Sequence, residues 1–170
     1  MDFNRPENSK TVQYGTAGFR GPASNGELNF VTHRTGCLAA LRSRSIGKAT
    51  GLMITASHNP VNDNGVKVTE PFGEMLIPEW ESVATQLTNS PSLDQEITKG
   101  TVNMNLYTVT ISTIILVIEE KSIVNKEGTV IIGRDTRPTS QILSACATEG
   151  NDIHLFLEFA LTHVLKSIRG

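Results

Sequence analysis

A chain of 170 residues of which 38% are hydrophobic is long enough to form one domain with a core of its own. Its 19% charged residues and formal net charge of −2 give no basic excess of the kind that favours nucleic acid or an anionic membrane. No apolar run is long enough to cross a bilayer, and the polar first residues lack the apolar core of a signal peptide. Cys37 and Cys146 belong to no Cys-x-x-Cys pair, which predicts buried free thiols and a cytoplasmic setting.

The first elements are a flexible N-terminus, residues 1–12, and a glycine-rich turn from Tyr14 to Pro22. The backbone N–H groups of such a turn, together with the guanidinium of Arg20, can hold a phosphate. A simple loop explains this stretch equally well.

A helix is expected over residues 31–42, where Leu38 and Leu41 recur at helical spacing. His33 and Arg34 are then expected on its solvated first turn. The residues from 43 to 51 are rich in Ser, Gly and Thr, and this composition predicts a linker.

A tight loop that carries a serine follows the next apolar segment. Leu52 to Ile54 predict a strand, and Asn59-Pro60 and Asn64-Gly65 are two of the dipeptides that most strongly bend a chain. A bend of this kind holds one side chain at the open end of a sheet, where a substrate can reach it. Ser57 is the residue placed there.

Beyond the bend, Val66 to Val68 predict a short strand that carries Lys67, and Pro78 opens a helix in which Trp80 is expected to be a core residue. From residue 91 to 126 the pattern is ambiguous: residues 107–112 alternate like a strand, whereas residues 114–124 fit a helix.

The last clear strand is Thr129 to Gly133, and charged residues follow it from Arg134 to Arg137. Helices are expected over residues 139–148 and 153–168. Because ligands gather outside the carboxyl ends of strands in open α/β sheets, the charged set and the serine loop are candidates for one site. The histidines of the last helix are expected at the surface, since no His-Glu-x-x-His spacing or carboxylate cluster predicts a metal site.

Four motifs together resemble the first domain of the α-D-phosphohexomutases: Tyr-Gly-Thr-Ala-Gly-Phe-Arg (14–20), Thr-Ala-Ser-His-Asn-Pro (55–60), Asp-Asn-Gly-Val-Lys (63–67) and Gly-Arg-Asp-Thr-Arg-Pro (133–138). The resemblance implies an α/β domain with a mixed sheet flanked by helices. Most members carry the Gly-Arg-Asp-x-Arg strand before the serine loop, whereas here it comes after. This order is similar to the branch that interconverts N-acetylglucosamine 6-phosphate and N-acetylglucosamine 1-phosphate on the way to UDP-N-acetylglucosamine.

The resemblance also implies roles for individual residues. Ser57 corresponds to the phosphoserine that donates its phosphoryl group to a phosphosugar and binds Mg²⁺ through its phosphate. Arg20, His58 and Lys67 match catalytic positions near the transferred group. Arg134 and Arg137 are expected either to bind substrate or to support the site, and Asp135 is expected to pair with an arginine.

The resemblance covers a domain from residue 13 to 150, with residues 99–113 as an insertion and residues 151–170 as a divergent C-terminal helix. The other three domains of the family have no counterpart in these residues, which predicts a catalytically incomplete fragment that lacks domains 2–4 and self-associates through its exposed interdomain surface. Two other hypotheses stay open: a phosphoglucomutase or phosphomannomutase relative with a different sugar, and a non-catalytic binding module derived from the domain.

Overall fold

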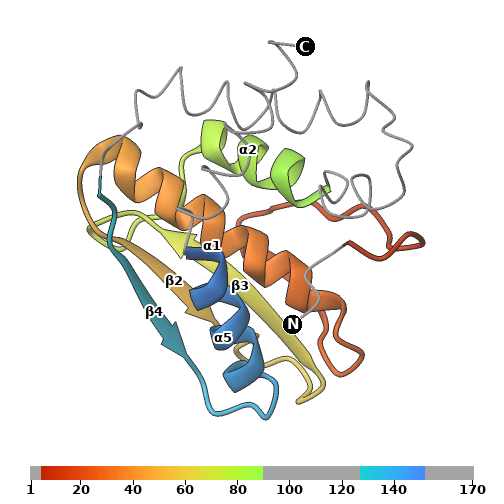
Figure 1. Ribbon diagram of the computed structural model, residues 1–170. Coiled ribbons are helices and arrows are strands. Elements are labelled where there is room, and N and C mark those ends of the chain that lie inside the picture. The colour runs from red at the N-terminus through yellow and green to blue at the C-terminus, as the bar shows by residue number, and fades with distance from the viewer. Residues whose placement is uncertain (1–4, 90–126, 152–170) are drawn as a thin grey trace, which may run out of the picture.

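The computed structural model describes residues 5–89 and 127–151, and Figure 1 shows their arrangement. In chain order the elements are β1 (Phe19–Pro22), α1 (Glu27–Ile46), β2 (Thr50–Ile54), β3 (Asp63–Thr69), α2 (Pro78–Asn89), β4 (Val130–Arg134) and α5 (Ser140–Asn151). The expectations for residues 91–126 and 153–168, the insertion at 99–113 among them, fall outside the described residues.

The four strands form one mixed sheet in the order β1-β3-β2-β4. β3 runs antiparallel to β1 and β2, whereas β2 and β4 are parallel, with Ile54 opposite Arg134 at their carboxyl ends. The expected mixed sheet flanked by helices is therefore confirmed. Because β2 and β4 are neighbours, the serine loop and the charged segment leave the sheet side by side.

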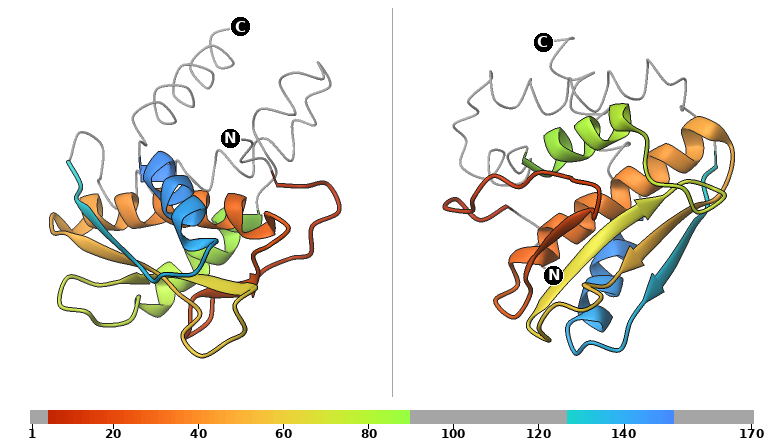
Figure 2. Two further views of the ribbon diagram at one scale, coloured as in Figure 1. Left: turned by 90° about the horizontal axis from the view of Figure 1, so that it is seen from below. Right: turned by 180° about the vertical axis from the view of Figure 1, so that it is seen from behind.

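One face of the sheet carries the hydrophobic core. Leu52, Ile54, Val66 and Val68 point from β2 and β3 to this face and are fully buried beneath α1 and α5. In the right-hand view of Figure 2 the strands lie in front of α1 and α5, so the opposite face of the sheet is turned toward the viewer. α2 packs against α1, and Trp80 is 1% exposed, which confirms it as a core residue.

α1 and α5 pack closely because glycines lie at their crossing. A Cβ at Gly36 would overlap the carbonyl oxygen of Ala147, and a Cβ at Gly150 would overlap that of His33. Any side chain at either position would push the helices apart, because core packing leaves no spare volume.

Several sequence expectations need correction. The glycine-rich turn contains a strand, β1, that the sequence did not predict, and α1 is longer than residues 31–42. The segment 43–51 is not a linker: α1 continues to Ile46, Gly47 ends it in the left-handed conformation, and β2 begins at Thr50. The Asn64-Gly65 pair is not a bend either, since β3 runs from Asp63 to Thr69.

His33 and Arg34 do not lie on a solvated first turn, because α1 begins at Glu27. Burial, followed by the charge of Arg34, lowers the pKa of His33 to about 4. The guanidinium of Arg34 donates to the carbonyl oxygens of Leu87 and Thr88 at the end of α2. Arg34 therefore helps to join α1 to α2.

Both cysteines are buried and neither forms a disulfide, as expected. Within residues 5–89 and 127–151, no helix has the length and apolarity needed to span a bilayer.

Candidate active site

Ser57 lies at the tip of the loop that leaves β2. Its side chain is exposed and its backbone φ is 53°, in the left-handed region that residues other than glycine rarely adopt. Two turns shape the loop: the N–H of Asn59 donates to the carbonyl of Ala56 at 3.0 Å, and that of Asp63 donates to the carbonyl of Pro60 at 3.0 Å. The loop thus places the hydroxyl of Ser57 beyond the end of the sheet.

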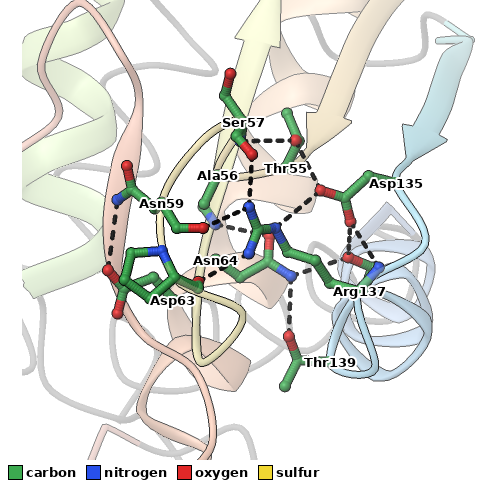
Figure 3. Close-up of polar contacts among 12 residues, drawn as sticks. Thr55, Ala56, Ser57, Asn59, Asp63, Asn64, Asp135, Arg137 and Thr139 are labelled. Carbon is green, nitrogen blue, oxygen red and sulfur yellow. Dashed lines mark hydrogen bonds and ion pairs between the residues drawn. The ribbon is translucent and has the colours of Figure 1, made fainter.

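A closed ring of contacts holds the backbone of Ser57 from both sides (Figure 3). The N–H of Ser57 donates to the Thr55 hydroxyl at 3.0 Å, and this hydroxyl donates to Oδ2 of Asp135 at 2.8 Å. Nε of Arg137 donates to the same oxygen at 3.1 Å. Nη2 of Arg137 donates in turn to the carbonyl oxygen of Ser57 at 2.6 Å, which closes the ring.

Arg137 also fixes the rest of the loop. Nη2 donates to the carbonyl of Asn59 at 3.0 Å, and Nη1 donates to that of Pro60 at 2.8 Å. The side chain is only 11% exposed. Asp135, which the sequence assigned to an arginine partner, forms its ion pair with this residue.

The carboxylate of Asp135 is the acceptor on which these contacts converge. Partial burial favours its neutral form, but donors from Ser140, the Arg137 backbone, Thr55 and the Arg137 side chain outweigh burial and lower its pKa to about 2. Asp135 is therefore a permanent anion at neutral pH.

Asn64 is a site residue that the sequence reasoning did not identify. Its side chain is fully buried, and its Nδ2 donates to the hydroxyls of Thr139 and Ser140, each at 2.9 Å. This amide ties β3 to the start of α5, and the Ser140 hydroxyl that accepts from Asn64 donates in turn to Asp135. The one sequence signal was its position in the motif at residues 63–67, where it was assigned to a turn.

The other predicted residues lie around the loop. Nη1 of Arg20 donates to the carbonyl of Ala56 at 3.1 Å, directly before Ser57. Arg20 pairs with Gly65 across β1 and β3, and Lys67 lies two residues further along β3, so both side chains leave the sheet on the face opposite the core. His58 and Arg134 are exposed, and neither side chain makes a hydrogen bond or ion pair among the residues that the structure describes.

Comparison with known proteins identifies the fold. The family model of the phosphoglucomutase/phosphomannomutase alpha/beta/alpha domain I matches residues 35–95. A solved N-acetylglucosamine-phosphate mutase, a member of the alpha-D-phosphohexomutase superfamily, superposes with a TM-score of 0.73 at 36% sequence identity over 87% of this chain and 29% of that chain. The described residues have the α/β fold of an α-D-phosphohexomutase domain I.

Two curated relatives show how much of a phosphohexomutase's length this chain spans. The human phosphoacetylglucosamine mutase is 43% identical over 84% of this chain and 23% of its own length, and the Candida albicans enzyme is 44% identical over 82% and 25%. This chain therefore spans about a quarter of the length of the curated relatives it matches.

A third relative bears on the metal expected from the phosphohexomutase family. The Aspergillus fumigatus N-acetylphosphoglucosamine mutase was solved in complex with GlcNAc-6P and magnesium, and it superposes with a TM-score of 0.64 at 38% identity over 83% of this chain and 23% of that one. Within the described residues of this chain, no three His, Cys, Asp or Glu side chains are grouped to hold a metal ion.

Proposed function

We propose that this chain supplies the phosphoserine domain of a phosphoacetylglucosamine mutase, which interconverts N-acetylglucosamine 6-phosphate and N-acetylglucosamine 1-phosphate. The observation that carries the proposal is the exposed Ser57, held at the end of β2 with its backbone fixed on both sides. Relatives of that name match most of this chain, which supports the choice of sugar.

The proposed reaction transfers a phosphoryl group twice. A hydroxyl oxygen of the sugar monophosphate attacks the phosphorus on Ser57, the bond from phosphorus to Oγ breaks, and the hydroxyl proton passes to a base. The product is a sugar bisphosphate. The bisphosphate then reorients in the site. Oγ attacks its other phosphorus, and the isomeric monophosphate leaves. Such transfers need positioning and charge neutralisation more than covalent help from the protein.

Four residues supply these needs in the proposal. Arg20 and Lys67 bring positive charge from the face of the sheet opposite the core and neutralise the phosphoryl oxygens. His58, adjacent to Ser57, carries the proton between Oγ and the sugar hydroxyl. Arg134, exposed at the end of β4, binds the phosphate of the substrate.

Magnesium is part of the proposed function through the phosphate on Ser57, with further ligands from outside the described residues. When bound, it would act as a Lewis acid on that phosphate.

The test is phosphorylation of the chain by glucose 1,6-bisphosphate, a compound with which the Aspergillus fumigatus mutase was solved. Incubation should place one phosphoryl group on Ser57, detected by mass spectrometry of the intact chain and of its peptides. Ser57→Ala should stay unmodified. Modification elsewhere, or none at all, would overturn the assignment of Ser57.

The chain is proposed to be a catalytically incomplete fragment, in which residues 13–150 form the domain and residues 151–170 diverge from the family. Neither buried cysteine forms a disulfide, in keeping with a cytosolic setting. Turnover of N-acetylglucosamine 6-phosphate by the purified 170-residue chain would contradict the fragment proposal.

Sugar choice separates the proposal from its nearest alternative, a phosphoglucomutase or phosphomannomutase relative. The complete gene product, assayed with glucose and N-acetylglucosamine phosphates in parallel, should prefer the N-acetylated sugar.

A binding module is the alternative from another class, and one observation favours it. Met53 and Ile131, on the face of the sheet opposite the core, are 45% and 66% exposed. Exposed apolar surface of this kind marks interaction sites. Light scattering should detect self-association of the chain through this face, and a monodisperse monomer at high concentration would contradict it.

A further inference from the structure

The position of Ser57 raises the question of what holds a strained backbone in place. A residue other than glycine in the left-handed region costs about 1–3 kcal/mol and persists only where its surroundings enforce it. At Ser57 those surroundings are the ring formed with Thr55, Asp135 and Arg137, because both the N–H and the C=O of Ser57 lead through it to one carboxylate.

The donors of Arg137 are nearly all engaged by this loop. A guanidinium has five N–H donors, and four hydrogen bonds of Arg137 go to Asp135 and to the carbonyls of Ser57, Asn59 and Pro60. One N–H is left for any other ligand. Asp135 also neutralises the charge, so the pair has little attraction for a substrate phosphate.

The direction of these contacts favours a phosphoserine. In Figure 3 the carbonyl of Ser57 points to Arg137, whereas the side chain of Ser57 extends the opposite way. The carbonyl oxygens of three loop residues thus point to the guanidinium and away from the phosphoryl group, which they would repel. The same hydrogen bonds therefore fix the backbone of Ser57 and leave its Oγ exposed.

We propose that Arg137 and Asp135 are positioning residues that hold Ser57 in its left-handed conformation for phosphoryl transfer, and that Arg137 does not bind the substrate phosphate. The inference rests on the proposed function of Ser57. It assigns to Arg137 a role different from the substrate contact considered from the sequence, and leaves that contact to Arg134.

The test compares Arg137→Lys with the wild-type chain. Lysine keeps the charge but cannot donate to Asp135 and three carbonyls from one plane. Phosphorylation of Ser57 by glucose 1,6-bisphosphate should slow by about 100-fold at saturating donor, the order of magnitude expected for a small displacement of a reacting group. The half-saturating donor concentration should stay unchanged. Arg5→Lys makes the same exchange at an arginine that donates to Ser9 and Asn89, outside the Ser57 loop, and is the matched control.

The opposite result, a raised half-saturating concentration with an unchanged maximal rate, would identify Arg137 as a substrate-binding residue and overturn the inference. A second readout does not depend on phosphorylation: the backbone amides of residues 57–59 and 61 should exchange faster with deuterium in Arg137→Lys than in the wild type. If wild-type Ser57 accepts no phosphoryl group, the proposed function fails, and the exchange rates still decide whether Arg137 orders the loop.

Thr55→Val is the milder variant to use if Arg137→Lys does not fold. It removes the hydroxyl that links Ser57 to Asp135 and preserves the shape of the side chain. It should also slow phosphorylation without changing the half-saturating concentration. Unchanged rate and unchanged loop exchange in this folded variant would overturn the ring as the cause of the Ser57 conformation.

Discussion

Replacing Asp135 by asparagine tests the electrostatics of the site through folding stability. The pKa of this carboxyl falls from its ordinary 3.8 to about 2 in the folded chain. Between these values the unfolded chain binds more protons than the folded chain. The ionised carboxylate therefore stabilises the fold above about pH 4, and this contribution is lost as the pH falls toward 2.

The magnitude follows from the shift. At 1.36 kcal/mol per pH unit, a shift of just under two units corresponds to at most about 2.5 kcal/mol. The Asp135 side chain is 29% exposed, so solvent screening reduces the expected contribution to about 1–2 kcal/mol.

The assay is urea unfolding of the wild type and Asp135→Asn, followed by far-ultraviolet circular dichroism at several pH values from 2 to 6. The stability advantage of the wild type over the variant should shrink by about 1–2 kcal/mol between pH 6 and pH 2. Glu79→Gln removes an exposed carboxylate and corrects for the change in net charge. A wild-type advantage that stays constant over this range would refute the reasoning, because the other carboxylates titrate in both chains.

Two further predictions concern backbone packing and strain. Gly150→Ala should lower the free energy of unfolding by about 2–3 kcal/mol, because the new methyl overlaps the carbonyl of His33, whereas helix propensity alone predicts a gain of about 1 kcal/mol. Gly21→Ala, which meets open space, is its control, and a stabilised Gly150→Ala would contradict the close packing of α1 on α5. The free energy of unfolding of Ser57→Gly should exceed that of Ser57→Ala by about 1 kcal/mol, since only alanine keeps a Cβ at a φ of 53°. Equal stability of the two chains in chemical denaturation would mean that Ser57 is not strained.

The local pattern of the sequence was enough to predict β2, α2, β4 and α5, because alternation, helical spacing and proline at a helix start are encoded by neighbouring residues. It also placed Ser57 at the tip of a loop and Asp135 beside an arginine. The resemblance to the phosphohexomutases depended on short motifs that can be read in the same way.

Elements whose formation depends on a distant partner were missed. β1 is a strand because Phe19 to Pro22 pair with β3, more than forty residues later in the chain, and its glycine-rich sequence carries little strand propensity of its own. The Asn64-Gly65 pair has the composition of a turn, but its pairing with Gly21 and Arg20 of β1 keeps it in β3. Tertiary pairing overrides a weak local preference in both cases.

The sequence by itself determined that a serine and a charged segment each follow an apolar strand. Only the tertiary structure decided what they do to each other. The parallel pairing of β2 with β4 brings Arg137 next to the carbonyls of a loop that lies about eighty residues earlier in the chain. Its guanidinium donates to these carbonyl oxygens, which leaves few N–H groups for a ligand. No local pattern carries this information, because the donors of an arginine are assigned by the acceptors that the fold places around it.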